Sequence, residues 1–303
     1  MHYENAKHRY FPKLSTDGVH WTPIDSSLVA VKDSTDRVLT LSLTKDTLWV
    51  AAQEVVSSAD VYQWCQQQAI HQDASFKVVG KSALGRDLPH LAIGEGSPKG
   101  KPTIVVISRQ HPPEVTGYFS MQAFVETLLD DTPLANAFRK RYNIWVFPLM
   151  NPDGVDLGHW RHNTGGIDLN RDWAFYHQPE VRNVAGYIVE TTKVNKNEVV
   201  LGLDFHSTFY DVYYTSAAPI TAQSRLPHFK DYWLQGIAAA IDGYTPRDEP
   251  SMDVRPISKN WFVRQFNAEG ITYEIGDDTP RDHILHKGEV AAIEMMQLLL
   301  YRN

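Results

Sequence analysis

Hydrophobic residues recur along the chain in short, largely apolar runs that alternate with longer amphipathic stretches. Such runs suit strands buried on both faces of a sheet. The predicted strands are residues 104–107, 143–150, 199–205 and 271–276. Apolar residues at helical spacing predict helices at 114–130, 178–195 and 289–301. This alternation predicts an α/β fold with a mixed central sheet flanked by helices.

The first part of the chain has a different pattern. Runs at 29–31, 38–43 and 48–52 are separated by turn residues, and 38–43 alternates apolar and polar positions, which predicts a small antiparallel β unit. Ser57 or Ser58 can then cap a helix that extends to about Gln72. We therefore predict two domains. Residues 1–70 form a small β domain that ends in a linker helix, and residues 71–303 form the α/β domain.

Composition excludes several classes of protein. The hydrophobic share of 43% and the charged share of 21% are ordinary for a soluble globular chain. A net charge of −7 without a basic run argues against nucleic-acid binding. The single cysteine, Cys65, excludes an internal disulfide framework. No apolar run approaches the roughly 20 residues that span a bilayer, and no signal-peptide core is evident, so we expect a cytoplasmic protein without membrane contact.

A polar turn follows the first buried strand of the α/β domain. Pro112 and Pro113 end the strand because they cannot donate to a ladder. His111 therefore lies at the strand end, and Glu114 opens the following helix. An imidazole and a carboxylate three residues apart can bind one cation, although an isolated His-x-x-Glu is more often an ordinary surface turn.

Two further polar residues strengthen the metal hypothesis. His206 follows the buried run at 199–205, and Glu274 lies inside the run at 271–276, where a carboxylate needs a partner. Ligands gather beyond the carboxyl ends of strands in open α/β sheets. His111, Glu114 and His206 then form a three-ligand Zn²⁺ set with an open position for water. Glu274 is the candidate general base.

Two arginines suggest the substrate. Arg171 can bind a carboxylate with a bidentate fork, and Arg161 can stabilise a developing oxyanion. Each alone is better explained as a surface ion-pair partner. Together with the metal-type residues they indicate a pocket that holds a free carboxylate next to an amide bond to be hydrolysed.

The order of these motifs resembles that of the zinc metallocarboxypeptidases related to carboxypeptidase A, from about Phe76 to the C-terminus. The matching segments are His111-Pro112-Pro113-Glu114, Asn151-Pro152-Asp153-Gly154, Trp160-Arg161, Asp168-Leu169-Asn170-Arg171, His206-Ser207 and Glu274. The resemblance implies a carboxypeptidase with one Zn²⁺ per chain, bound by His111, Glu114 and His206. It implies catalytic roles for Glu274 and Arg161.

The resemblance also implies supporting residues. Asp168 matches a carboxylate that orients the first zinc histidine, Asn170 and Arg171 match the pair that binds the C-terminal carboxylate, and Ser207 follows the third ligand at the substrate site. The sequence is most similar to the cytosolic carboxypeptidase branch, some of whose members trim glutamates from protein tails. Arg255 and Lys259 are candidates for a cation that favours acidic side chains. The expected partners are peptide or protein C-terminal tails.

Two alternatives stay open. Asp204-Phe205-His206-Ser207-Thr208 also suits a zinc amidohydrolase that deacylates small N-acyl amino acids, as in the aspartoacylase and succinylglutamate desuccinylase branch. A non-catalytic binding protein on the same fold is the second alternative. The other histidines, His90 among them, lack a spacing argument, and we predict surface or loop positions for them.

Overall fold

The structure is a computed structural model that describes residues 1–2, 7–44 and 47–301. The chain divides into two compact units, Met1–Val56 and Ser57–Asn303. Helix α1 (Ser58–Gln68) packs on strands of the second unit. The predicted domain boundary at residue 70 follows this helix, whereas the division between the units precedes it. The helix begins as predicted, because the side chains of Ser57 and Asp60 form a capping box.

The first unit contains short antiparallel strands, as the sequence predicts. In its described residues, β1 (Lys13–Ser15) lies between β2 (Thr22–Pro23) and β5 (Trp49–Ala51). A 3-10 turn, η1 (Ser26–Leu28), leads into β3 (Val29–Val31), which pairs with β4 (Arg37–Leu39). These are the small antiparallel sheets predicted for the N-terminal part.

The described residues of the second unit contain an eight-stranded mixed sheet with the order β12-β11-β13-β10-β8-β9-β7-β6. Its strands are β6 (Ala74–Lys81), β7 (Asp87–Ile93), β8 (Pro102–Ser108), β9 (Asn143–Phe147), β10 (Glu198–Thr208), β11 (Val212–Ser216), β12 (Asp248–Ser251) and β13 (Glu269–Gly276). The four strands β13, β10, β8 and β9 are parallel neighbours, so their carboxyl ends meet at one edge. This arrangement confirms the predicted fold class.

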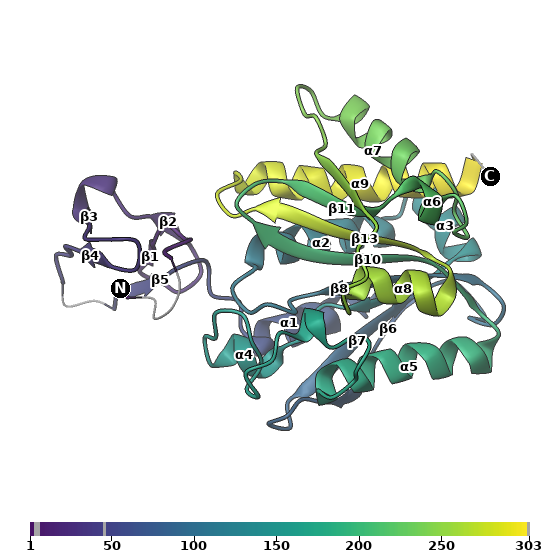
Figure 1. Cartoon of the computed structure of the whole chain (residues 1–303), viewed down its shortest axis with the longest axis horizontal. Helices are drawn as coiled ribbons and strands as arrows, with labels where there is room; N and C mark the ends of the chain where they lie inside the picture. The colour runs from purple at the N-terminus through teal and green to yellow at the C-terminus, as the bar shows by residue number, and fades with distance from the viewer. Residues whose placement is uncertain (3–6, 45–46, 302–303) are drawn as a thin grey trace. The chain divides into compact units, whose positions relative to one another are not determined.

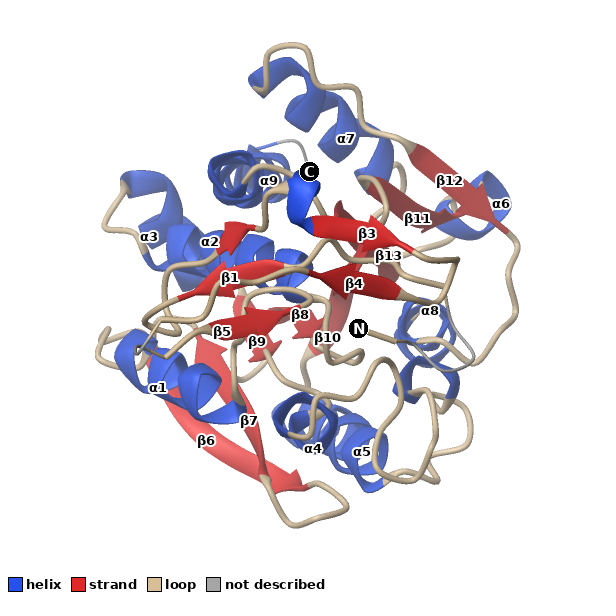
Figure 2. Cartoon of the chain, turned by 90° about the vertical axis from the view of Figure 1, so that its left-hand side faces the viewer, coloured by secondary structure: helices blue, strands red, loops and turns tan. Residues whose placement is uncertain are grey.

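Helices cover both faces of this sheet (Figure 1). They are α2 (Val115–Leu129), α3 (Pro133–Arg141), α4 (Pro152–Asp156), η2 (Leu169–Arg171), α5 (Pro179–Asn195), α6 (Ala218–Thr221), α7 (Phe229–Ala240), α8 (Ser258–Phe266) and α9 (Arg281–Tyr301). Figure 2 shows α2 and α9 on one face and α5 and α8 on the other. Among the helices that the structure describes, none is long and apolar enough to cross a bilayer.

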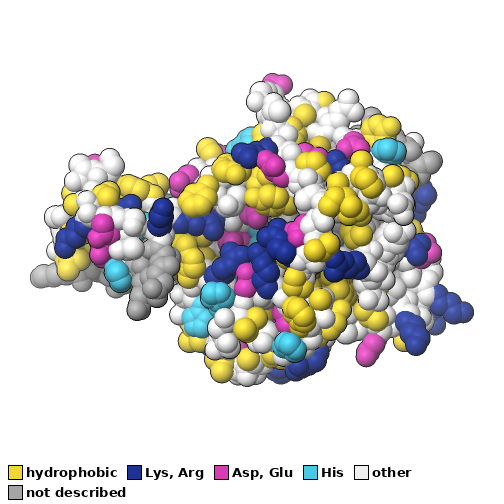
Figure 3. Space-filling model, in the orientation of Figure 1, with side chains coloured by type: hydrophobic (Ala, Val, Ile, Leu, Met, Phe, Trp, Pro, Cys, Tyr) yellow, Lys and Arg dark blue, Asp and Glu magenta, His cyan; other side chains and the backbone are white. Residues whose placement is uncertain are grey.

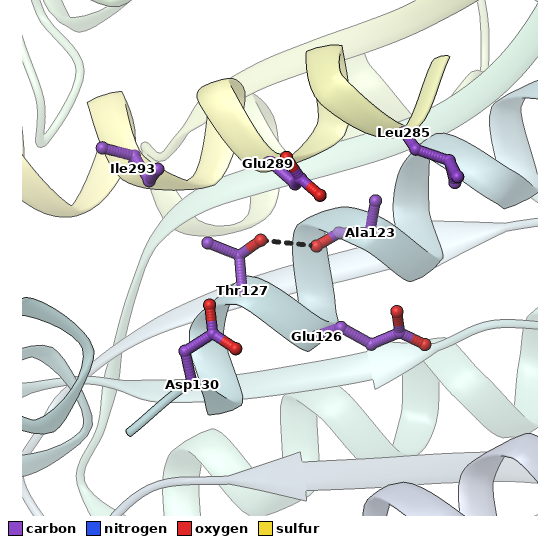
Figure 4. A pocket seen from close by; sticks show the side chains of 7 residues that line it. All are labelled: Ala123, Glu126, Thr127, Asp130, Leu285, Glu289 and Ile293. Atoms are coloured by element: carbon purple, nitrogen blue, oxygen red, sulfur yellow. Dashed lines mark hydrogen bonds between the residues drawn. The ribbon is translucent and has the colours of Figure 1, made fainter. Parts of the chain in front are cut away.

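Helix α2 lies unusually close to the central strand β10. A Cβ atom added at Gly117 would stand 2.2 Å from the carbonyl oxygen of His206, so only glycine permits this approach. The other side of α2 packs on α9. Figure 4 shows a hollow on that seam, where the Thr127 hydroxyl donates to the carbonyl of Ala123 at 2.8 Å.

Candidate metal centre

Three predicted ligands come together at the carboxyl edge of the parallel strands. His111 lies in the turn after β8, Glu114 is the N-cap residue of α2, and His206 lies two residues before the end of β10. Strand β10 therefore extends beyond the predicted end at His206. One ligand atom from each of the three residues lies within 4.8 Å of the other two, and all three side chains are buried.

Glu114 bridges the two imidazoles. Its Oε1 lies 3.0 Å from Nδ1 of His111, and its Oε2 lies 2.7 Å from Nδ1 of His206. The backbone N–H of Ser207 donates to Oε2 at 3.2 Å. Burial alone would raise the pKa of Glu114, but the two adjacent imidazoles outweigh burial and hold that pKa well below its usual value. Both Nδ1 atoms therefore face an ionised carboxylate.

Asp168 supports His111 from outside this cluster. Its Oδ1 lies 2.9 Å from Nε2 of His111, and its Oδ2 accepts a hydrogen bond from Nε of Arg161 at 2.8 Å. Burial raises the pKa of Asp168, but the hydrogen bond with His111 and the charges of His111, Arg161 and Arg171 lower it overall. The predicted pairing of Asp168 with the first histidine is present in the geometry.

His206 has a carboxylate neighbour of its own, Asp204. The Oδ2 atom of Asp204 lies 2.8 Å from Nε2 of His206 and also accepts hydrogen bonds from Gln110 Nε2, at 2.7 Å, and from the Ser258 hydroxyl. Burial would lower the pKa of His206, but the charges of Asp204 and Glu114 raise it well above its usual value. Both histidines of the cluster thus have a carboxylate at Nε2.

Glu274 stands beside His206 in the sheet. The two residues are register partners in the parallel pair of β10 and β13, so their side chains share a face. Adjacent strands are about 4.8 Å apart. Glu274 is partly accessible, whereas its neighbours Tyr273 and Ile275 are buried. The predicted base therefore lies within one strand spacing of a predicted ligand.

The two predicted arginines lie on the His111 side of the cluster. Arg161 and Arg171 have side chains that are 35% and 38% exposed, so their guanidinium groups reach solvent next to Asp168. Figure 3 shows Lys and Arg side chains gathered with acidic ones on the visible face of the second unit. Arg171 donates to the carbonyl of Asn170 at 2.7 Å. Both guanidinium groups can contact a ligand there.

Asn170 and Ser207 are more enclosed than the arginines. The Oδ1 atom of Asn170 accepts the backbone N–H of Ser258 at 2.9 Å, and its Nδ2 lies 3.2 Å from Nε2 of His206. The Ser207 hydroxyl accepts hydrogen bonds from Thr116, at 2.7 Å, and from the N–H of Gly117, at 2.9 Å. Both side chains are thus engaged in hydrogen bonds within the protein, and their substrate-binding roles stay predictions.

The two cations predicted to select acidic side chains differ in position. Arg255 is exposed, pairs with Asp253 and lines a surface hollow with Trp173 and Arg264. Lys259 is only 1% exposed, and its Nζ donates to the carbonyl of Thr215 at 3.0 Å. Burial lowers the pKa of Lys259 to about 8. Lys259 is therefore an enclosed cation, whereas Arg255 is neutralised at the surface.

Sequence reasoning assigned no role to three residues that surround the cluster: Gln110, Asp204 and Ser258. A signal existed for Asp204, because residues two apart in a strand point to the same face and Asp204 precedes His206 by two. No comparable signal existed for Ser258, which helix α8 brings from a distant part of the chain to within hydrogen-bond reach of Asp204.

The donor set fits a Zn²⁺ ion. Two imidazole nitrogens and one carboxylate are a common protein ligand set for catalytic zinc, and each histidine has a carboxylate on its second nitrogen, as metal-binding histidines usually do. Without a cation, the cluster would be one buried carboxylate between two buried imidazoles. The chemistry of these residues therefore favours a divalent metal.

Sequence comparisons find relatives of this chain among known proteins. The chain is 28% identical to an uncharacterised protein of Zymomonas mobilis over 68% of its length and 56% of that protein. It is 38% identical to cytosolic carboxypeptidase 2 of Danio rerio over 36% of its length and 15% of that protein. The chain thus spans about half of one relative and a small part of the other.

Solved structures share the fold. A metallo-carboxypeptidase from Burkholderia cenocepacia matches with a TM-score of 0.77 at 19% identity, covering 96% of this chain and 80% of that one. A metallo-carboxypeptidase from Pseudomonas aeruginosa in complex with (2-guanidinoethylmercapto)succinic acid matches with a TM-score of 0.76 at 21% identity, with the same coverage. The profile of one family, described as zinc carboxypeptidase, matches residues 61–277. The chain therefore belongs to the zinc carboxypeptidase family.

Proposed function

We propose that this protein is a zinc-dependent carboxypeptidase that removes the C-terminal residue from peptides or protein tails. The observation that carries the proposal is the position of Glu274, which is the register partner of His206 at the His111-Glu114-His206 cluster. A ligand set, an acid beside it and two partly exposed arginines are the groups that amide hydrolysis next to a carboxylate requires.

His111, Glu114 and His206 would hold one Zn²⁺. When bound, the ion would acidify a water molecule and polarise a carbonyl group. Glu274, the register partner of His206, would take a proton from the attacking water and deliver it to the leaving nitrogen. Arg161, whose Nε donates to Asp168, would stabilise the developing oxyanion through its terminal nitrogens.

Arg171 is the proposed ligand of the substrate's C-terminal carboxylate. It lies in η2 beside Arg161, and its side chain is 38% exposed. A guanidinium group binds a carboxylate through two parallel hydrogen bonds, which fixes the orientation of the substrate as well as adding affinity. Asn170 would support this contact from its enclosed position. A substrate with an amidated C-terminus would lose the interaction with Arg171.

Lys259 is the proposed determinant of side-chain preference. It is a buried cation on α8, next to Ser258 of the cluster, and the carboxylates of Asp253 and Glu269 influence its charge. A substrate carboxylate that displaced the Thr215 carbonyl from Lys259 would gain a charge-assisted hydrogen bond. We therefore propose acidic C-terminal residues as preferred substrates. The expected cytoplasmic location stays a proposal as well.

A substrate panel tests this function. Zinc-loaded protein is incubated with peptides that differ only in having a free or an amidated C-terminus, and with N-acyl amino acids. Release of the C-terminal residue from free peptides alone is expected. Cleavage of N-acyl amino acids without peptide cleavage would instead establish the amidohydrolase alternative. Zinc binding without turnover of any substrate would favour a binding protein.

A further inference from the structure

One oxygen of Asp204 has hydrogen-bond partners on the same strand and in two distant parts of the chain. Its Oδ2 is 2.8 Å from Nε2 of His206 on the same strand and 2.7 Å from Nε2 of Gln110, the residue before ligand His111. The hydroxyl of Ser258, at the start of α8, donates to the same oxygen. Asp204 thus connects the His206 strand, the His111 turn and helix α8 at a single point.

The position is unfavourable for a carboxylate on packing grounds alone. Asp204 has no exposed surface, and its second oxygen, Oδ1, has no hydrogen-bond partner among the described residues. Among the described residues, His206 lies at salt-bridge distance from Asp204, whereas no Lys or Arg does. Burying an acid with one unsatisfied oxygen lowers stability, and the hydrogen bonds to Oδ2 have to offset that cost.

The surroundings of His206 explain why an acid is required. Two amide nitrogens also lie close to Nε2 of His206, that of Asn170 at 3.2 Å and that of Gln110 at 3.5 Å. Both amides are fixed in this orientation. The oxygen of Asn170 accepts the N–H of Ser258 at 2.9 Å, and the oxygen of Gln110 accepts the indole N–H of Trp173 at 2.8 Å.

These amides therefore present N–H donors to His206. Two donors facing Nε2 favour a lone pair there, which would leave the proton of a neutral imidazole on Nδ1. The Nδ1 atom is the one that faces Glu114, at 2.7 Å, inside the cluster. A proton on Nδ1 would block its use as a ligand atom. Asp204 supplies the acceptor that reverses this preference.

We propose that Asp204 is the positioning residue that selects the Nε2–H form of His206 and so aims the Nδ1 lone pair at the metal. The inference rests on the proposed function, because it assumes that the cluster binds Zn²⁺. It assigns to Gln110 and Ser258 the task of holding the accepting oxygen in place. The His206 side of the site then depends on a carboxylate that contacts no arginine among the described residues.

Zinc affinity tests the proposal. Metal-free wild type, Asp204→Leu and Asp204→Asn are titrated with Zn²⁺ against a chromophoric chelator, and the unfolding temperature of each apo form is measured. Losing a carboxylate partner of a ligating histidine typically weakens binding about 10- to 100-fold. We expect the larger loss for leucine, which removes the acceptor, and the smaller one for asparagine, which keeps an acceptor but removes the charge. The apo leucine variant should unfold at a lower temperature, because buried donors lose their acceptor, so affinities are compared at a temperature at which every variant is folded.

The matched control is Glu269→Gln. Glu269 is another buried acid, 1% exposed, at the opposite end of β13 from Glu274. The zinc affinity of the Glu269→Gln variant should equal that of the wild type. Wild-type affinity in a folded Asp204→Leu variant would overturn the proposal, and so would a lower apo unfolding temperature with unchanged affinity. Failure of the wild type itself to bind Zn²⁺ would instead refute the proposed function.

A second measurement needs no variant. Nitrogen-15 NMR of the zinc-loaded wild type reports which imidazole nitrogen of His206 carries hydrogen. We expect a hydrogen-bonded Nε2–H with Nδ1 bound to the metal. A proton on Nδ1, or metal binding through Nε2, would overturn the assignment even if the Asp204 variants failed to fold.

Discussion

His206 and His90 are both buried histidines on strands of the same sheet, and their surroundings are opposite. His206 on β10 lies between two carboxylates, at 2.7 Å and 2.8 Å from its two nitrogens. His90 on β7 has no exposed surface, and neither of its nitrogens has a hydrogen-bond partner in the described chain. Its ring centroid lies 4.7 Å from that of Phe147 and 4.9 Å from that of Tyr187.

Equal burial therefore has opposite electrostatic results. Desolvation lowers the pKa of His90 to about 3, with a small contribution from the charge of Lys77. The same desolvation acts on His206, but two carboxylates outweigh it and raise the pKa. The neighbours of a buried histidine, and not its burial, indicate whether it belongs to a functional site.

Removing the proposed base should have the largest effect. Glu274→Gln keeps the size of the side chain but cannot accept the proton of water, so kcat should fall by about 10²- to 10⁴-fold. Metal analysis should still find one zinc per chain, because Glu274 is not in the ligand cluster. Glu269→Gln serves as the control for loss of an acid on the same strand. Full activity of Glu274→Gln would refute the proposed role.

Asp168→Asn distinguishes the role of Asp168, which contacts His111, from that of Asp204, which contacts His206. We expect zinc binding to weaken about 10- to 100-fold, as for Asp204. Asp168 also holds Arg161, so kcat should stay low when zinc is added in excess, whereas Asp204→Asn should recover most of its activity. Titrating activity with zinc distinguishes the two. Equal recovery in both variants would show that Arg161 needs no fixed partner.

Lys259→Met tests a third buried ionisable group. If Lys259 contacts acidic side chains, kcat/KM for a C-terminal glutamate relative to leucine should fall about 10-fold, the value of one charge-assisted hydrogen bond. Because the pKa of Lys259 is about 8, the wild type should lose this preference as pH rises above that value. Arg255→Gln should change the ratio less, since Arg255 pairs with Asp253. An unchanged ratio in Lys259→Met would remove it from the substrate site.

His90→Leu should change activity least, because its effect is on stability alone. The unfolded chain binds a proton at this histidine below pH 6.5, whereas the folded chain resists it until about pH 3, so folding stability falls as pH decreases between these values. In the wild type this histidine contributes a slope of up to about 1.4 kcal/mol per pH unit to the free energy of unfolding, and the variant should lack that contribution. Denaturant unfolding from pH 4.5 to 7 measures it. Exposed His177→Gln is the control, and altered kcat in His90→Leu would contradict a purely structural role.

The sequence predicted what local pattern encodes and missed what tertiary packing decides. His111 and Glu114 became candidates because a proline pair and a helix start place them, and Glu274 because an acid within an apolar run is unusual. The surface position predicted for His90 is wrong. Strand β7 is buried on its His90 side by Tyr187 of α5, and nothing near His90 in the sequence shows that a residue 97 positions later covers it.

The close approach of α2 to β10 has a consequence for the dimensions of the metal centre. Glu114 begins that helix and His206 lies on that strand, so the missing side chain at Gly117 sets how far apart the two ligands stand. The contact between the backbones of α2 and β10 fixes this separation, and no side chain has to be accommodated between them at Gly117. The separation of Glu114 and His206 is therefore set by the packing of α2 on β10 and does not depend on a bound ion.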